Sequence, residues 1–240
     1  MIREELSRTE NLIGEEALNK LINANVIVFG IGGVGSYTVE ALARSGIGKI
    51  SLVDKDIVEK SNINRQLIAT SSTVGHSKVS VASQRIRDIN PLCEVTEYEL
   101  FYLPETKDKI DLSKYDYIVD AIDNVTAKLL LVTQASALSI PIISSMGTGN
   151  KLDPTAFEVT DIYDTQVCPL AKVMRHELRK RGIDSLKVVY SKEESVQKGF
   201  SSETENLIAS RRPAPASIAF VPSVAGLIIA GEVIKDITGV

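Results

Sequence analysis

The sequence predicts an α/β fold, in which helices cover both faces of a mostly parallel sheet and a C-terminal α+β extension follows. Three observations support this prediction. Helical and strand patterns alternate as far as Ser145, and a glycine-rich turn joins the first strand to the next helix. The chain of 240 residues, 44% of them hydrophobic, can also bury a sizeable core.

The hydrophobic periodicity predicts the elements of the first part in order. Runs rich in β-branched residues predict strands over residues 26–30, 49–53, 93–98, 116–121 and 140–145. Helical spacing predicts helices over residues 14–22, 34–45, 75–89 and 124–139. Strands that alternate with helices in this way pair in parallel, which gives the Rossmann-like arrangement.

Beyond Ser145 the pattern is looser. A glycine-rich loop precedes a strand over residues 157–162, a basic helix over 170–181 and a strand over 186–190. The polar stretch 192–216 predicts a mobile loop. A last strand and an apolar helix over residues 224–237 are expected to finish the chain.

Composition and charge exclude several classes of protein. A net charge of −4 argues against a globally basic nucleic-acid binder, although charge can be local. The two cysteines rule out a four-cysteine zinc site, so no zinc is expected. A start without an apolar run and a final apolar stretch broken by Gly and Glu predict a cytoplasmic protein without disulfides or membrane spans.

The glycine-rich turn over residues 30–35 predicts a nucleotide site. Gly30, Gly32 and Gly35 match G-x-G-x-x-G between a strand and an amphipathic helix, and Gly33 adds a fourth glycine. This spacing allows a tight turn, close approach of phosphate to the backbone, and packing of the helix on the strand. Backbone N–H groups at the start of the helix favour an anion. Asp54 closes the second strand, where an acid hydrogen-bonds ribose hydroxyls.

The residues after the second strand favour ATP over a nicotinamide or flavin cofactor. Asn62, Arg65 and Gln66 follow Asp56, and Lys78 begins the next helix. Two cations and two amides suit a triphosphate whose charge must be neutralised when a phosphorus atom is attacked. A dehydrogenase would share the glycine turn but leaves these cations unexplained. The plainer alternative is that Arg65 and Lys78 are solvated surface charges.

Asp123 and Asn124 follow the strand predicted to end near residue 121, at the edge where open α/β sheets bind ligands. We expect both to contribute to the nucleotide site and Asp123 to hold Mg²⁺ that bridges the phosphates. Alternatively, Asp123 caps the helix that begins at Val125. A non-catalytic nucleotide-binding module would not need this acid.

These motifs resemble the ubiquitin-activating-enzyme-like (ThiF/MoeB-type) adenylating family. They are Gly-x-Gly-Gly-Val-Gly-Ser, Asp-x-Asp, Ser-Asn-x-Asn-Arg-Gln, a Lys after Gly-x-x, and Asp-x-x-Asp-Asn. The resemblance implies that Asp54, Arg65, Lys78 and Asp123 bind ribose, phosphates and Mg²⁺. It also implies a homodimer in which Arg8 reaches the ATP of the partner subunit. The implied catalytic residues are Arg8, Arg65, Lys78 and Asp123.

Within that family, the chain resembles the tRNA threonylcarbamoyladenosine dehydratases over residues 7–15, 144–155, 169–175 and 220–226. The implied reaction adenylates the threonyl carboxylate of the modified adenosine in tRNA, closes a hydantoin ring and releases AMP. Residues 1–150 would form the adenylation domain, and residues 151–240 its extension for substrate, tRNA and dimer contacts. Adenylation of a ubiquitin-like sulfur carrier is the alternative, and whether a sulfur-relay protein assists stays open.

The ring-closing nitrogen is tethered to the activated group, so positioning suffices and no essential cysteine is expected. Cys93, at the start of a strand, is expected to be a small core residue. Cys168 precedes Pro169, where an aspartate is more usual in these dehydratases. A tolerated substitution is favoured there over a reactive thiol, because reactivity needs a depressed pKa.

Two features of the second half suggest contacts with other molecules. Cations between residues 172 and 192 outnumber the acids, which fits a tRNA backbone, although a solvated helix face explains them as well. The candidate tRNA residues are Lys172, Arg175, Arg179, Lys180, Arg181, Arg211 and Arg212. The final helix is apolar nearly all round, so it is either buried in its own core or part of a dimer interface.

Overall fold

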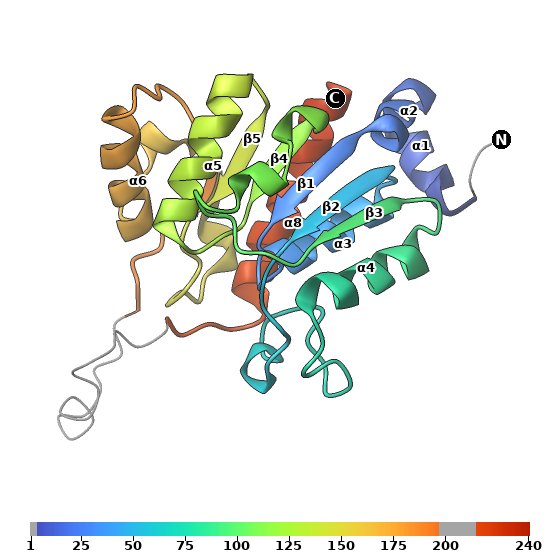
Figure 1. Cartoon of the computed structure of the whole chain (residues 1–240), viewed down its shortest axis with the longest axis horizontal. Coiled ribbons are helices and arrows are strands. Elements are labelled where there is room, and N and C mark those ends of the chain that lie inside the picture. Colours follow the sequence, from blue (N-terminus) through green and yellow to red (C-terminus); the bar gives the residue numbers. More distant parts are fainter. Residues whose placement is uncertain (1–3, 197–214) are drawn as a thin grey trace.

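Seven strands form one sheet in the computed structural model, which describes residues 4–196 and 215–240. They are β1 (Asn25–Phe29), β2 (Lys49–Val53), β3 (Glu94–Tyr98), β4 (Tyr117–Asp120), β5 (Ile142–Ser145), β6 (Phe157–Asp161) and β7 (Lys187–Ser191). The order across the sheet is β3-β2-β1-β4-β5-β7-β6 (Figure 1). Each neighbouring pair is parallel except β6 with β7, which is antiparallel.

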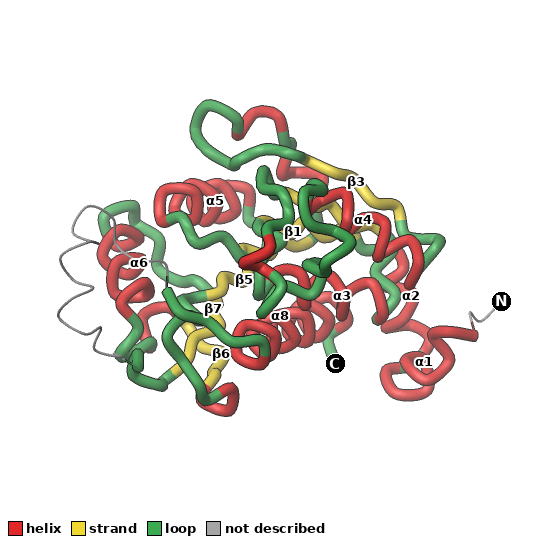
Figure 2. The backbone as a smooth tube through the Cα atoms, turned by 90° about the horizontal axis from the view of Figure 1, so that it is seen from below, coloured by secondary structure: helices red, strands yellow, loops and turns green. Residues whose placement is uncertain are grey.

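Helices cover both faces of this sheet, so the predicted α/β fold is confirmed. One face carries α3 (Gly35–Arg44), α4 (Lys78–Ile89) and α8 (Phe220–Thr238), and the other carries α5 (Val125–Leu138) and α6 (Pro169–Arg179). Figure 2 shows α5 and α8 on opposite sides of β5. Alternate residues of β1 serve the two cores: Val26 and Val28 join one cluster, and Ile27 and Phe29 the other. Each fully buried side chain of this size contributes about 1.5–3 kcal/mol.

The strands and helices predicted up to Ser145 are all present, with ends shifted by a few residues. The predicted leading helix is α2 (Glu15–Asn23), but a separate helix, α1 (Ser7–Ile13), precedes it. Gly14, with φ of 85°, separates the two, because its left-handed backbone cannot continue a helix. None of the residues of α1 is buried, so its sequence has no periodic apolar pattern from which the helix could be predicted.

The last strand predicted before the final helix is wrong, because residues 215–219 contain no strand and α8 already begins at Phe220. Pro222 lies in the first turn of α8, where a helix tolerates proline, so the helix begins four residues before the predicted start at Val224. The predicted mobile loop over residues 192–216 lies mostly outside the described residues, at 197–214. Over the described ranges, no helix is both long and apolar enough to cross a membrane.

Candidate nucleotide-binding site

A cavity of about 610 Å³ lies at the carboxyl ends of β1, β2 and β4. These three strands are neighbours in the sheet, so the loops that follow them meet at one edge. The predicted nucleotide residues that line the cavity are Gly30, Gly32, Gly33, Asp54, Asp56, Asn62, Arg65, Gln66, Lys78, Asp123 and Asn124. Gly35 is not part of the lining and instead begins α3.

The glycines of the turn are required by close approaches of the backbone. Gly30 has φ of 87°, and a Cβ there would lie 2.7 Å from the Ala121 carbonyl oxygen. A Cβ on Gly35 would lie 1.8 Å from the Gly30 carbonyl oxygen. Gly32 and Gly33 face the cavity, where a Cβ would approach side chains alone. The turn therefore brings backbone N–H groups and the start of α3 to the cavity, which suits an anion.

Asp54 holds this turn against the end of β2. Its Oδ2 accepts a hydrogen bond from the Ile31 N–H at 2.7 Å, and its Oδ1 accepts one from the Asp56 N–H at 2.9 Å. The carboxylate is thus oriented by two backbone donors at the edge of the cavity. Each oxygen keeps a lone pair with which it could accept a ribose hydroxyl.

The two predicted cations both line the cavity but differ in their contacts. Lys78 has a side chain only 8% exposed, and its Nζ lies 3.2 Å from Asp56 Oδ2. The Arg65 Nη1 donates to the Ser61 carbonyl and to Asn64 Oδ1, both at 2.9 Å. The solvated alternative is therefore wrong for Lys78, while Arg65 remains partly exposed at the cavity wall.

Gln66 carries a buried acceptor that lacks a partner. The side chain is 7% exposed, and its Oε1 makes no hydrogen bond within the described part of the chain. Such a group costs about 1–3 kcal/mol when it is left unpaired. Since Gln66 lines the cavity, a hydroxyl or amino donor of a bound molecule would remove this cost.

The structure separates the roles of Asp123 and Asn124. Asn124 is the N-cap of α5, and its Oδ1 accepts the Ala127 N–H at 3.0 Å. The alternative that Asp123 caps the helix is therefore wrong. Asp123 is exposed and lines the cavity, so its carboxylate is available to a ligand.

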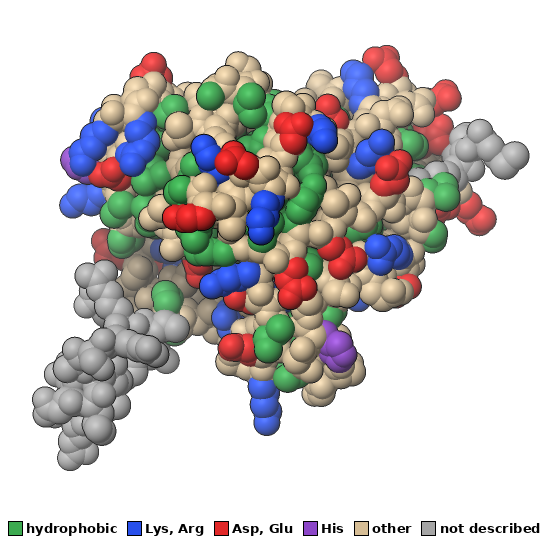
Figure 3. Space-filling view, viewed as in Figure 1, with side chains coloured by type: hydrophobic (Ala, Val, Ile, Leu, Met, Phe, Trp, Pro, Cys, Tyr) green, Lys and Arg blue, Asp and Glu red, His purple; other side chains and the backbone are tan. Residues whose placement is uncertain are grey.

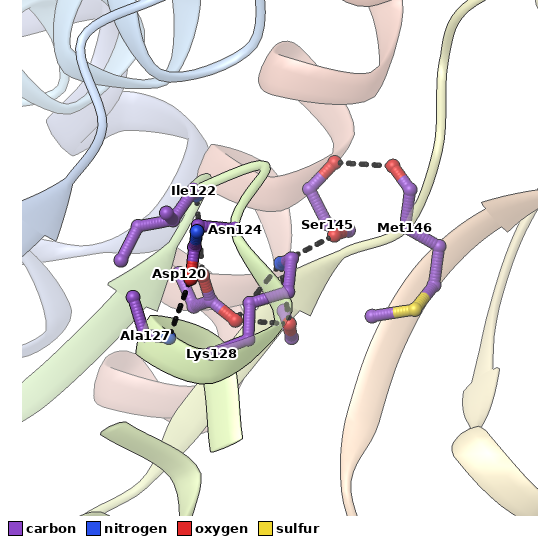
Figure 4. Close-up of polar contacts among 8 residues, drawn as sticks. Asp120, Ile122, Asn124, Ala127, Lys128, Ser145 and Met146 are labelled. Carbon is purple, nitrogen blue, oxygen red and sulfur yellow. Dashed lines mark hydrogen bonds and ion pairs between the residues drawn. The ribbon is translucent and has the colours of Figure 1, made fainter. Parts of the chain in front are cut away.

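A fully buried ion pair supports the loop that carries Asp123 (Figure 4). Lys128 Nζ lies 2.9 Å from Asp120 Oδ2, and it also donates to Ser144 Oγ at 3.1 Å and the Ser145 carbonyl at 2.8 Å. Asp120 Oδ1 accepts the Ile122 N–H at 3.2 Å. The cluster joins the ends of β4 and β5 to α5. Sequence reasoning missed it, although residues 124, 128, 131, 132 and 135 share one helix face.

The apolar part of the cavity lining was also missed. It is made by Phe29, Val53, Leu100, Phe101, Tyr102 and Ile122. The rings of Phe29 and Tyr102 meet edge to face with centroids 4.8 Å apart, and Lys55 Nζ lies 4.6 Å from the Phe101 centroid. Burial raises the pKa of Tyr102 to about 12, so this wall stays neutral. Such a surface suits the flat face of a base.

Metal ligands in the described part of the chain do not form a preformed cage. No group of three or more His, Cys, Asp or Glu residues there could hold a metal ion. Asp123 instead offers one carboxylate beside the phosphate-binding turn. Mg²⁺ is commonly bound by one or two carboxylates together with phosphate oxygens, so the donor set suits Mg²⁺ on a nucleotide.

Three other residues singled out in the sequence lie away from the cavity lining. Arg8 is exposed on α1. Cys93 is buried beside β3, as predicted, and Cys168 is buried in the cluster between α5 and α6. A Cβ on Gly147 would lie 4.0 Å from the Cys168 sulfur, so this thiol packs against the loop after β5.

Figure 3 shows Lys and Arg side chains gathered over α6. Two of them form ion pairs with one acid. Lys180 Nζ and Arg181 Nη1 lie 2.9 Å and 2.8 Å from Glu177. Hydrogen bonds from these two cations lower the pKa of Glu177 to about 2.

The remaining cations of this surface are less constrained by acids. Arg175 donates to the Thr165 carbonyl at 2.9 Å, and the Arg179 guanidinium lies 4.9 Å from the Tyr163 ring centroid. Lys172 is exposed and makes no ion pair with a described acid. Arg211 and Arg212 lie outside the described residues.

Comparison with known proteins gives matches along nearly the whole chain. The profile of the ThiF family matches residues 6–240. A tRNA threonylcarbamoyladenosine dehydratase of Bacillus subtilis (strain 168) is 47% identical over 240 residues, which cover 97% of this chain and 94% of that protein. A crystal structure of an E. coli tRNA N6-threonylcarbamoyladenosine dehydratase with AMP has a TM-score of 0.88 and 33% identity, covering 99% of this chain and 95% of that one. The same enzyme in complex with ATP has a TM-score of 0.86 at the same identity and coverage.

Proposed function

The chain belongs to the ThiF family, and we propose that it is an ATP-dependent enzyme that dehydrates threonylcarbamoyladenosine in tRNA. The observation that carries this proposal is similarity through both halves of the chain. The Bacillus dehydratase aligns with 97% of it, and the E. coli dehydratase superposes on 99%. Structures of that E. coli enzyme hold AMP or ATP, which supports the proposal that the cavity at the glycine turn binds ATP.

The reaction removes one water in two steps. The threonyl carboxylate attacks the α-phosphorus of ATP, a bond to pyrophosphate breaks, and an acyl adenylate forms. The carbamoyl nitrogen then attacks the activated carbonyl and loses its proton, and AMP leaves as the hydantoin ring closes. Holding a tethered nucleophile at its carbonyl removes roughly 7–11 kcal/mol of entropic barrier in favourable cases. This step needs no cysteine, and Cys168 is buried and packed.

The cavity residues divide according to the parts of ATP. The apolar wall that includes Phe101 would take the base, and Asp54 the ribose. The glycine turn and the start of α3 would hold the phosphates. Arg65 and Lys78 would offset charge that develops at the α-phosphate. The support is that all these groups line one cavity, in the order in which β3, β2 and β1 follow each other across the sheet.

Lys78 would exchange partners when ATP binds. Its ammonium is paired with Asp56, a carboxylate whose side chain is 54% exposed and therefore well solvated. A phosphate carries more charge than that carboxylate, so it should compete for the same cation. Asp56 would then orient Lys78 toward the phosphates.

Mg²⁺ would be held by Asp123 together with phosphate oxygens. The carboxylate is exposed at the cavity and does not cap α5, because Asn124 is the N-cap. When bound, the ion would neutralise charge on the phosphates and on the departing pyrophosphate. Asp120 and Lys128 would keep the loop of Asp123 in place through their buried pair.

The cationic surface over α6 would contact the tRNA backbone. Lys172, Arg175 and Arg179 lie on this helix, and Lys180 and Arg181 follow it. Glu177 offsets only part of their charge. Such contacts position a nucleic acid without reading its sequence.

A homodimer with shared active sites is the assembly that fits two features. Phe220 and Leu227 of α8 are 43% and 49% exposed, and Ile218 before it is 38% exposed, so this end of the chain presents apolar side chains that no other described residue fully covers. Arg8 precedes α2, which leads into the amino end of β1, whereas the cavity lies at the carboxyl end. Arg8 would therefore serve the cavity of the partner subunit.

Mass spectrometry of nucleosides tests the proposed function. tRNA that carries threonylcarbamoyladenosine is incubated with the enzyme, ATP and Mg²⁺, and is then digested. The modified nucleoside should lose the mass of one water, with one AMP formed per turnover. An unchanged nucleoside would contradict the proposal. ATP consumption that appears only with a Gly-Gly-tailed carrier protein would favour sulfur-carrier adenylation instead.

A further inference from the structure

We propose that Asn64 is a positioning residue, which fastens Arg65 to the loop after β5 through residues 216 and 217. Arg65 lies at the phosphate side of the cavity, and the loop after β5 forms its far end. The inference rests on the proposed function, because it takes Arg65 to contact ATP. It adds a mechanical link between the nucleotide and the place where the acid substrate enters.

The first part of the link is the side-chain amide of Asn64. Its Oδ1 accepts the Arg65 Nη1 at 2.9 Å, and its Nδ2 donates to the Ser217 carbonyl at 3.0 Å. One amide thus joins two segments that are 153 positions apart in the sequence. Ser217 itself lines the cavity, as does Arg65.

The second part of the link is Asn150. Its N–H donates to the Ala216 carbonyl at 2.7 Å, and its Oδ1 accepts the Ala216 N–H at 2.8 Å. Its own carbonyl accepts the Val196 N–H at 2.8 Å. Asn150 has φ of 58°, a left-handed conformation that asparagine adopts more readily than most residues. The residue therefore holds three segments together at a single turn.

Packing shows independently that residues 215–217 are seated on this loop. A Cβ added to Gly149 would lie 2.6 Å from the Pro215 Cβ, so the Gly149 backbone packs tightly against the Pro215 ring. Thr148, just before Gly149, lines the cavity opposite the ribose acid in strand order. Thr148 and Ser217 are thus held as one wall by the Asn150–Ala216 pair.

The position of this wall explains why the link matters for the reaction. Along the edge of the sheet, Asp54 follows β2, the glycine turn follows β1, Asp123 follows β4, and Thr148 follows β5. If the nucleoside occupies the β2 end, the acid must approach the α-phosphate from the β5 end. The wall of Thr148 and Ser217 borders that approach. Asn64 therefore sets the distance between this wall and the cation at the phosphates.

Two single variants and their combination test the link. Asn64→Ala removes both bonds of the first part. Asn150→Gly keeps the left-handed backbone and removes the side-chain acceptor. Each should lower kcat for dehydration roughly two- to tenfold, the effect of one lost hydrogen bond. For Asn150→Gly, the Kd for MgATP in the absence of tRNA should stay within about twofold of wild type, because this residue does not touch Arg65.

The double variant distinguishes a connected link from two separate effects. If the two asparagines act in series, the double variant should be no slower than the slower single variant, within about twofold. Losses that multiply would overturn the proposal, as would single variants with wild-type kcat. Asn64→Gln keeps donor and acceptor and should recover part of the lost rate. Asn64→Asp keeps the acceptor for Arg65 but cannot donate to Ser217, so a wild-type rate for it would also overturn the link.

The controls separate this inference from the proposed function. Asn19→Ala removes an exposed asparagine on α2, remote from the cavity, and should leave kcat unchanged. Melting temperatures of all variants should agree with wild type within a few degrees, since the altered side chains are not in the core. If the wild-type enzyme fails to dehydrate the nucleoside, the proposed function fails. If wild type is active and the variants match it, only the positioning role fails.

Discussion

Asp123 and Asn124, which follow β4, have different roles: one faces the cavity and the other stabilises a helix. Asn124 caps α5, which leaves the carboxylate of Asp123 exposed at the cavity. Behind them, Asp120 and Lys128 form a pair with fully buried side chains. Residues 120–128 therefore contain a carboxylate that is available to a ligand, an amide that caps α5, and a buried ion pair that holds the loop between β4 and α5 in place.

Asp123→Ala should lower the rate of AMP formation roughly 100-fold or more, because charge at the phosphates loses its carboxylate-bound counter-ion. The measurement is AMP release with modified tRNA and saturating MgATP. Asp88→Ala, at an exposed position on α4, is the matched control and should behave as wild type. Near-normal turnover of Asp123→Ala would exclude the assigned role.

Lys128→Met should lower the free energy of unfolding by about 3–5 kcal/mol, since Asp120 would remain as a buried charge without its partner. Urea denaturation measures this change. The double variant Lys128→Met, Asp120→Asn should recover part of the loss, because the unpaired charge is gone. Lys114→Met alters a side chain that is 73% exposed and should change stability by about 0.5 kcal/mol or less. Equal stability of wild type and Lys128→Met would show that the ion pair makes no net contribution to the free energy of unfolding.

Residue chemistry was predictable from the sequence where it depended on local spacing. The glycine turn, Asp54, Lys78 and Asp123 each follow a strand or begin a helix, so the predicted elements bring them to one edge. The unpaired Gln66 Oε1 and the Lys128 cluster depend on which side chains meet after folding. Sequence spacing does not determine which side chains come into contact in the folded protein.

At the level of elements, α8 combines a buried face with an exposed one. Val221, Ala225 and Ile229 are fully buried in the core, while Leu227 is 49% exposed. The sequence showed a helix that is apolar nearly all round and left burial and a dimer interface as alternatives. The structure confirms burial for one side, and the dimer interface stays a prediction for the other.

Leu227→Asp should convert the dimer to monomers, because a charge would enter the proposed apolar interface. Light scattering after gel filtration measures the mass against the chain mass of 26.1 kDa. Leu92→Asp, at a side chain 72% exposed away from α8, should leave the dimer intact. Wild-type protein that is already monomeric at micromolar concentration would contradict the proposed assembly.

Shared active sites can be tested on the proposed dimer. Arg8→Ala and Asp123→Ala should each be inactive alone. Random exchange of subunits in an equal mixture should restore roughly a quarter of the wild-type sites, because half of the dimers are mixed and each has one intact site. No recovery after exchange would place Arg8 outside the partner's cavity.

The helix α6 should determine the salt dependence of tRNA binding. Reversing Arg179 and Arg181 to Glu removes two phosphate contacts, so the slope of log K against log salt should become shallower by about two. Filter binding at several salt concentrations measures the slope. Reversing Arg87 and Lys114, on other surfaces, is the control of equal charge. A flat salt response of the wild-type protein would speak against a tRNA surface at α6.

On the scale of the whole molecule, three tyrosines predict a loss of stability at high pH. Burial raises the pKa of Tyr102 to about 12 and raises the pKa values of Tyr115 and Tyr117 above their usual value. The folded state therefore keeps these protons above pH 10, where an unfolded tyrosine releases them. Their contribution is fully present below about pH 10 and is lost as the pH rises toward the folded values.

Melting temperatures between pH 8 and 11.5 measure this effect. The melting temperature should fall steeply above pH 10, and Tyr115→Phe should make the decline shallower by removing one of the groups. Lys187 acts in the same direction: burial lowers its pKa, but the contacts with Glu232 and Asp236 outweigh this and raise the pKa overall. A melting temperature that stays constant to pH 11.5 would show that the buried tyrosines do not ionise on unfolding.

The overall architecture was predictable from periodicity, but the placement of the second half was not. The sequence predicted β6 and β7 as strands after the nucleotide-binding part, without a position in the sheet. In the structure, β7 lies between β5 and β6 in the same sheet, and α8 returns to pack on α3. Pairings between distant segments are set by the burial of shared faces, which a single sequence does not display.

The return of α8 to α3 also matters while the chain is being synthesised, because part of the cavity wall comes from a segment made long after α3. Thr38 of α3 donates to the Gly226 carbonyl of α8 at 3.0 Å, and a Cβ on Gly226 would lie 2.3 Å from the Val34 carbonyl oxygen. Pro222, from the first turn of α8, lines the ATP cavity. In chain order α8 comes long after the glycine turn, so the emerging chain holds every glycine of the turn well before it holds the complete cavity. Until α8 has emerged, the apolar face of α3 that it covers is exposed to chaperones, and the cavity lacks the part of its wall that Pro222 supplies.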